Sequence, residues 1–160
     1  MKKIVSIALL ALSFSIAQGQ YALQTGNLQA NGGFGLSGWA LPVYVGLEYG
    51  YDKNISIGGD LSFSALNTVV SANANYHFVE MLEIEDVFDV YAGMNLGFFI
   101  RNQRLNPESL PPYYNNSVPV NIGVQVGGRY YFKKNLAVNL ELGGGIAFSG
   151  GKIGVSYLLK

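Results

Sequence analysis

The chain has 160 residues, 21 glycines, no cysteine and a formal net charge of zero, and only 12% of its residues are charged. That length suits one domain, and the lack of cysteine excludes a disulfide framework and a thiolate metal site. No basic stripe of the kind that binds nucleic acid occurs. Apolar residues make up 49% of the chain, yet beyond the N-terminus no apolar run approaches the roughly 20 residues of a membrane helix.

The N-terminus has the pattern of a secretory signal peptide. Two lysines follow the initiating methionine, an apolar stretch runs to Ala17, and Gly19 completes a small-residue cleavage pattern. We therefore predict a signal peptide over residues 1–19, export from the cytoplasm, and one domain over residues 20–160. The alternative is a buried N-terminal helix.

Eight segments of the chain alternate between bulky apolar and small polar residues. Neighbouring side chains on a strand point to opposite faces, so this period of two is typical of strands between two different environments. No segment shows a sustained helical period. The predicted strands are Leu28–Leu36, Val43–Tyr51, Ile55–Ser64, Val70–Phe78, Asp89–Arg101, Val118–Phe132, Leu136–Phe148 and Ile153–Leu159.

Short turns between these segments predict an antiparallel meander. Residues 52–54 and 133–135 are three-residue connections that end in asparagine, which tolerates the left-handed conformation of such hairpins. The first connection places Tyr51 opposite Ile55, so that apolar faces meet. Gly150-Gly151 suits a two-residue turn in the last hairpin.

The composition of the two faces indicates which one lies inside. An eight-stranded barrel has an interior just wide enough to be filled by side chains. If the bulky face pointed inward, the chain would be a soluble, lipocalin-like barrel with an exterior unusually poor in lysine and glutamate. If it points outward, it forms a lipid-facing band, and the small polar residues fit a narrow wet lumen. Aromatic residues near strand ends, such as Tyr49 and Phe132, favour the second interpretation. We predict an all-β, eight-stranded antiparallel up-and-down transmembrane β-barrel.

Turn lengths predict the orientation of this barrel. If the N-terminus starts in the periplasm, the short turns at 52–54 and 133–135 are periplasmic, as is usual for such barrels. The acidic turn at 80–86 then lies on the same side, and the long polar loop at 101–117 is external. In that loop, Tyr113 and Tyr114 are candidate contacts for a surface partner, and an ordinary solvated loop is the alternative.

Charged residues on the polar face are the candidate site. The turn at 133–135 sets Arg129 opposite Asn139 and diagonal to Glu141, and Glu48 and Asp60 also point inward. One interpretation is an ion path or gate through the lumen. We favour a salt-bridge and hydrogen-bond network that fills it, because charges in a confined interior need partners.

The single histidine, His77, is the one candidate for a catalytic base. Ser71 shares its face but lies six residues away, about 20 Å along a strand, which is too far for nucleophilic catalysis. No phosphate loop, metal-ligand cluster or paired-carboxylate site occurs at usable spacing. The sequence therefore predicts a non-enzymatic protein without a cofactor or a metal.

Three stretches carry a family resemblance: FDVYAGMNLGF (88–98), GGRYYFKKNLAVNLELGGG (127–145) and KIGVSYLL (152–159). The chain resembles the small outer-membrane β-barrels of Gram-negative bacteria, the OmpA- and OmpX-like transmembrane domains. In that family a G-x-R-Y strand, a short turn and a strand with an inward glutamate recur. The last stretch is similar to the family's assembly signal, with Gly154, Tyr157 and Leu159 at its key positions, although this chain ends in lysine where many members end in an aromatic residue.

The resemblance implies an outer-membrane location, with membrane lipid and the barrel-insertion machinery as partners. We predict an integral outer-membrane β-barrel of structural or surface-interaction type with a narrow polar lumen. A small ion or solute channel is the first alternative. A lipid-modifying enzyme and a soluble lipocalin-like carrier are further alternatives.

Overall fold

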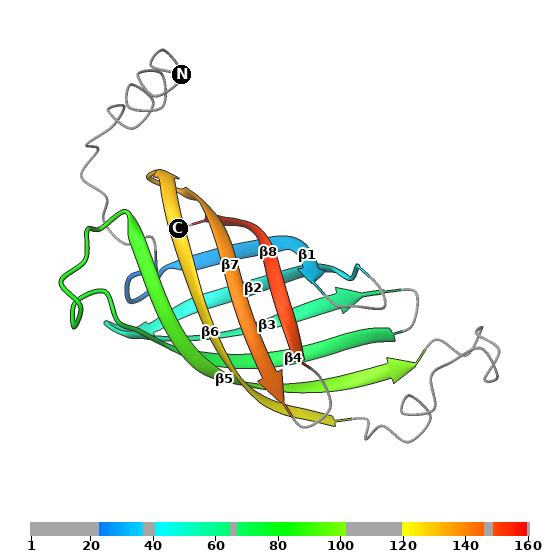
Figure 1. Cartoon of the computed structure of the whole chain (residues 1–160). Helices are drawn as coiled ribbons and strands as arrows, with labels where there is room; N and C mark the ends of the chain where they lie inside the picture. The colour runs from blue at the N-terminus through cyan, green and yellow to red at the C-terminus, as the bar shows by residue number, and fades with distance from the viewer. Residues whose placement is uncertain (1–22, 37–40, 65–66, 102–119, 146–148, 160) are drawn as a thin grey trace, which may run out of the picture.

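The computed structural model describes residues 23–36, 41–64, 67–101, 120–145 and 149–159, and these form a closed barrel (Figure 1). Each strand pairs antiparallel with the next along the chain, and the first pairs with the last. The strands are β1 (Leu28–Leu36), β2 (Val43–Asp52), β3 (Ile55–Phe63), β4 (Asn67–His77), β5 (Phe88–Arg101), β6 (Val120–Lys133), β7 (Leu136–Gly145) and β8 (Ser149–Leu158). The predicted eight-stranded meander is confirmed.

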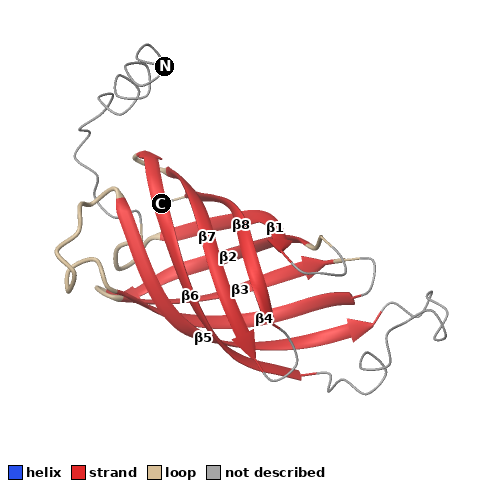
Figure 2. Cartoon of the chain, in the orientation of Figure 1, coloured by secondary structure: helices blue, strands red, loops and turns tan. Residues whose placement is uncertain are grey.

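The two ends of the barrel differ. The β2–β3, β4–β5 and β6–β7 connections lie at one end of the barrel, which we call the turn end, and we call the opposite end of the strands the loop end (Figure 1). The predicted signal peptide at 1–19 and most of the 101–117 loop, including Tyr113 and Tyr114, lie outside the described residues. Figure 2 shows strands and loops, and the described residues include no helix long and apolar enough to cross a membrane.

The apolar face points outward. Val124 of β6 and Met94 of β5 are each 62% exposed, whereas Gln29 and Ser56 on the opposite face are fully buried. The predicted orientation of the two faces is therefore confirmed. Closure also satisfies the backbone, because both partners of every strand are other strands and no edge faces the hydrocarbon.

The short hairpins differ from the prediction in register and in backbone conformation. Asp52, not Tyr51, is the register partner of Ile55, and the register shifts between Gly50 and Asp52. The same shift occurs between Tyr131 and Lys133 before the other short turn. The first residue of each predicted connection, Asp52 or Lys133, therefore ends the strand beyond a β-bulge, and only two residues form each turn. The expected left-handed conformation of Asn54 and Asn135 was wrong, because Glu83 is the only described non-glycine residue with a positive φ.

The predicted turn at Gly150-Gly151 was also wrong. Both glycines lie within β8, where they pair with Gly143 and Leu142 of β7. The local preference of Gly-Gly for a turn is overridden, because an interrupted ladder would leave backbone groups unpaired inside the barrel wall. The described part of β7 ends at Gly145, and its predicted end, Phe148, lies outside the described residues.

Glycine is required where the first and last strands meet. Gly154 of β8 is the register partner of Gly33. A Cβ atom at Gly154 would overlap the carbonyl oxygen of Gly32 and lie 2.7 Å from the Tyr44 hydroxyl. The inward position 154 therefore has no room for a larger residue.

We expect Gly154→Val to lower the free energy of unfolding by about 1–3 kcal/mol, the usual cost of overpacking. Urea titration of the refolded protein, followed by electrophoresis without boiling, measures the loss. Gly128→Val is the matched control, because a Cβ atom there meets only the carbonyl oxygen of Asp89, at 3.7 Å. Equal losses in the two variants would contradict the steric argument.

Candidate functional site

Arg129 is the centre of a buried ion cluster in the lumen. Its Nη1 donates to Oδ2 of Asp89 at 2.8 Å, and its Nη2 donates to Oε2 of Glu48. The guanidinium carbon also lies 4.4 Å from the centre of the Tyr91 ring. The three charged side chains come from β2, β5 and β6 and are each at most 5% exposed. We call Glu48, Asp89 and Arg129 the central cluster.

Neutral groups complete the hydrogen bonding of Glu48. Its carboxylate accepts from Ser56 Oγ at 2.5 Å, from Asn75 Nδ2 at 3.0 Å and from Asn31 Nδ2 at 3.2 Å. Such complete pairing is what a buried charge requires, because an unpaired one costs several kcal/mol. The Nε atom of Arg129 is buried and makes no hydrogen bond among the described residues.

His77 joins this cluster at the turn end of the barrel. Its Nε2 lies 2.8 Å from Ser56 Oγ, and its Nδ1 lies 2.7 Å from Asp89 Oδ1. These distances match a Ser-His-Asp triad, but the arrangement lacks two properties of one. The Ser56 hydroxyl donates to Glu48 rather than to His77, and Ser56 has no exposed surface for a substrate to reach. The three side chains therefore hold the network together.

Sequence reasoning missed Ser56 and Asp89 as partners of His77, because it searched along one strand. Ser56 comes from β3 and Asp89 from β5, the two strands that flank β4. All three positions lie on the predicted inward face, and the register pairs Ser56 with Asn75, close to His77. A search of inward positions across neighbouring strands would have found them.

Lys152 organises a second cluster nearer the loop end. Its Nζ lies 2.9 Å from Oε1 of Glu141 and 3.2 Å from Oδ2 of Asp60, and it lies 5.2 Å from the centre of the Tyr44 ring. Asp60 also accepts from Asn73 Nδ2 at 3.0 Å. The Lys152 side chain is 29% exposed, so water reaches this cluster more easily than the central one.

The strand register at Arg129 was predicted correctly, but Glu141 is not its ion-pair partner. Arg129 is the register partner of Asn139, as expected. Glu141, however, bonds with Lys152 and accepts from the Tyr91 hydroxyl at 3.0 Å. The Tyr91 ring occupies the space over Gly127, the residue opposite Glu141, and so separates Glu141 from Arg129.

Hydrogen bonds between side chains link strands right round the barrel. Asn139 of β7 accepts from the Tyr44 hydroxyl of β2 at 2.8 Å and donates to Ser156 of β8 at 2.8 Å. Tyr131 of β6 donates to Gln29 of β1 at 2.8 Å. Together with the two ion clusters, these bonds involve inward side chains from all eight strands. The lumen is thus filled by a connected polar network.

The three residues of the predicted assembly signal lie on different sides of the barrel wall. Tyr157 is 46% exposed on the outward face of β8, and Leu159 is 52% exposed just beyond that strand. Gly154 lies on the inward face. The described residues contain no group of three or more acidic, histidine or cysteine side chains suited to a metal ion.

Comparison with known proteins gives a likeness of fold. No protein-family model and no curated protein matches the chain. The N-terminal β-barrel domain of Pseudomonas aeruginosa OprF is 15% identical, with a TM-score of 0.64 over 84% of this chain and 98% of that one. The Yersinia pestis outer-membrane protein Ail is 10% identical, with a TM-score of 0.55 over 84% and 99%.

A chain from a study of de novo designed transmembrane β-barrels is also similar. It is 16% identical, with a TM-score of 0.59 over 85% of this chain and 98% of that one. At such identities the likeness concerns the fold and carries no residue roles. The chain therefore has the eight-stranded transmembrane β-barrel fold of the small outer-membrane proteins, in agreement with the resemblance in its sequence.

Proposed function

We propose that this protein is an integral outer-membrane barrel of a Gram-negative bacterium, with a structural or surface-interaction role and no enzymatic activity. The observation that carries the proposal is the filled lumen, in which a hydrogen-bonded network joins all eight strands beneath an apolar exterior. A barrel built in this way stays folded in the membrane and presents its loop end to the surroundings. Its partners would be outer-membrane lipid, the insertion machinery and a surface ligand of the 101–117 loop.

A narrow cation channel is the second candidate, and the charge of the lumen favours it. Four carboxylates, those of Glu48, Asp60, Asp89 and Glu141, face two permanent cations, Arg129 and Lys152, among the described inward residues. These inward residues therefore carry a net charge of −2 when His77 is neutral. A negative lumen attracts cations, but the central cluster would have to rearrange before they could cross.

Cell fractionation and planar-bilayer recording test the proposal together. We expect the protein in the outer-membrane fraction, with a band that shifts in electrophoresis between unboiled and boiled samples. We expect no reproducible unitary conductance from pure refolded protein. A protein that stays dissolved in buffer without detergent would overturn the membrane assignment, and regular conductance steps would favour the channel.

A further inference from the structure

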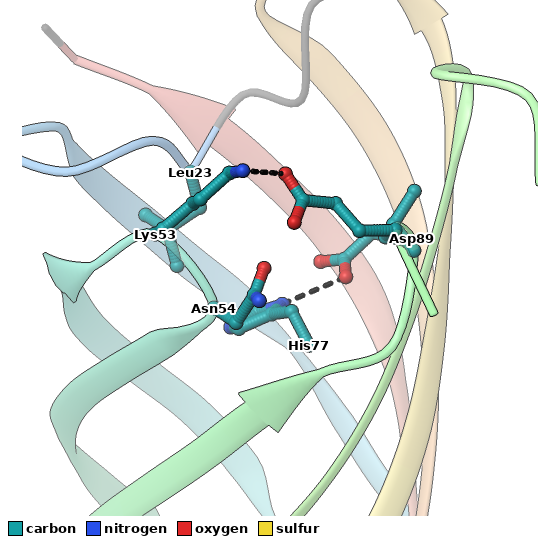
Figure 3. Close-up of a pocket in the computed structure, with 7 residues that line it drawn as sticks. Leu23, Lys53, Asn54, His77 and Asp89 are labelled. Atoms are coloured by element: carbon teal, nitrogen blue, oxygen red, sulfur yellow. Dashed lines mark hydrogen bonds and ion pairs between the residues drawn. The ribbon is translucent and has the colours of Figure 1, made fainter. Parts of the chain in front are cut away.

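A small pocket lies at the turn end of the lumen, directly beside the buried ions (Figure 3). His77 and Asp89 form its polar side, where their hydrogen bond is drawn, and Leu23 and Val79 form its apolar side. Leu23 is only 6% exposed and Val79 only 4%, although both lie at the end of the barrel. Leu23 therefore covers the entrance to the charged interior.

The segment that carries Leu23 is a short strap, residues 23–27, which precedes β1. Main-chain bonds tie it to the end of β2: Gly26 N donates to Gly50 O at 2.8 Å, and Gly50 N donates to Asn27 O at 3.0 Å. A third bond, from Asn27 N to Gln24 O at 2.9 Å, closes its turn. Gly26 adopts a φ of 87°, which a residue with a side chain rarely adopts.

Gly50 lets the strap cross the inward side of β2. A Cβ atom at this position would overlap the carbonyl oxygen of Gln24 and crowd the backbone nitrogen of Thr25. The absence of a side chain at this inward position therefore allows another backbone segment to approach the strand closely. The strap thus rests on Gly50 and directs Leu23 into the mouth of the barrel.

An ion pair spans the same mouth. Lys53 in the β2–β3 turn lies 2.8 Å from Oε1 of Glu80 in the β4–β5 turn, and both residues line the pocket. The hydrogen bond from Lys53 to Glu80 raises the pKa of the lysine, so the lysine stays charged at neutral pH. The pair is well exposed, so it adds little stability and leaves Leu23 as the main barrier to water.

We propose that residues 23–27 are a releasable latch that closes the turn end of the lumen and controls the entry of water and small solutes to the central cluster. The strap has one buried side chain and three main-chain bonds, whereas each strand is paired on both sides along its length. Segments with so few contacts open before the rest of the fold. The latch belongs to the barrel itself and does not depend on a surface ligand.

Cysteine reactivity tests the latch, because the chain has no cysteine of its own. The reporter is Val79→Cys in the refolded full chain in detergent micelles, labelled with a negatively charged methanethiosulfonate. We expect slow labelling in the parent and labelling at least about tenfold faster after Leu23→Ser or Gly50→Ala, which corresponds to a loss of about 1.4 kcal/mol in latch closure. Unchanged migration without boiling shows that the barrel itself remains folded.

Matched variants separate the latch from general loosening. Leu82→Ser makes the same substitution at a residue of the turn end that is 52% exposed and does not line the pocket, so the reporter should react as in the parent. Met81→Cys, at a residue that is 63% exposed, should label rapidly in every background. The proposal is overturned if Val79→Cys labels as fast as Met81→Cys in the parent, or if Leu23→Ser and Gly50→Ala leave its rate unchanged.

A milder variant keeps the test decisive if the first two do not fold. A Cβ atom at Gly26 meets nothing within 4 Å, so Gly26→Ala only strains the positive φ. That strain should speed labelling of Val79→Cys about fivefold. An unchanged rate in this folded variant would again contradict a releasable latch.

Discussion

Replacing Arg129 with methionine is expected to destabilise the barrel by about 3–5 kcal/mol, because two buried carboxylates then lose their shared cation. Glu48 and Asp89 are each 3% exposed, and water cannot replace the guanidinium without opening the lumen. Methionine preserves much of the side-chain volume, so a cavity contributes little to the loss. Denaturant titration in detergent micelles, followed by tyrosine and tryptophan fluorescence, measures the free energy of unfolding.

Two comparisons test whether the unpaired carboxylates cause the expected loss of stability. Adding Glu48→Gln and Asp89→Asn to Arg129→Met removes the uncompensated carboxylates and should restore part of the lost stability. Lys152→Met breaks the second cluster, whose lysine is 29% exposed, and should cost less than half as much because water can solvate the remaining carboxylates. Equal stabilities of Arg129→Met and Lys152→Met would contradict the argument that burial makes the loss of the cation more costly in the central cluster.

An arginine on the outward face should also be costly in a bilayer. Val124 lies on the outward face of β6, is 62% exposed and has Met94, at the middle of β5, as a register partner. We expect Val124→Arg to lower stability in lipid vesicles by about 2–4 kcal/mol, the cost of a charge near the bilayer midplane. Urea-induced unfolding from the vesicles provides the measurement.

The loss of stability should depend on the depth of the arginine in the bilayer, and this dependence distinguishes lipid contact from other effects of arginine. Tyr51→Arg, at the turn end of β2, should cost only about 0–1 kcal/mol, because a charge near the membrane interface remains hydrated. Val124→Leu should leave stability nearly unchanged. On a soluble barrel an exposed substitution such as Val124→Arg would change stability by only about 0.5 kcal/mol, so a near-neutral result would refute the lipid-facing assignment.

The strands and their faces were predictable because they depend on local alternation. From Val43 to Tyr51, for example, every second residue is bulky and apolar, and β2 exposes these residues on its outward face. Strand ends were less predictable, as Gly150 and Gly151 show. A Gly-Gly pair favours a turn in isolation, but pairing with β7 extends β8 through both residues.

The partners of the charged residues could not be found by reading neighbouring positions. Arg129 bonds with Glu48, 81 residues earlier in the chain, because both side chains reach across the same narrow lumen. The expected partner, Glu141, is nearer in sequence but is separated from Arg129 by the Tyr91 ring. Lys152 and Asp89 had no distinguishing pattern of their own, and their roles depend on what closure brings opposite them.

The amino-acid sequence alone determined that this chain forms eight strands with an apolar and a polar face, because a period of two is a property of each strand by itself. It also determined that inward charges would need partners. Only the tertiary structure decided which charges pair and that Leu23 covers the turn end, because closing the sheet brings together side chains that are distant in sequence, and steric fit in a narrow lumen then selects among them.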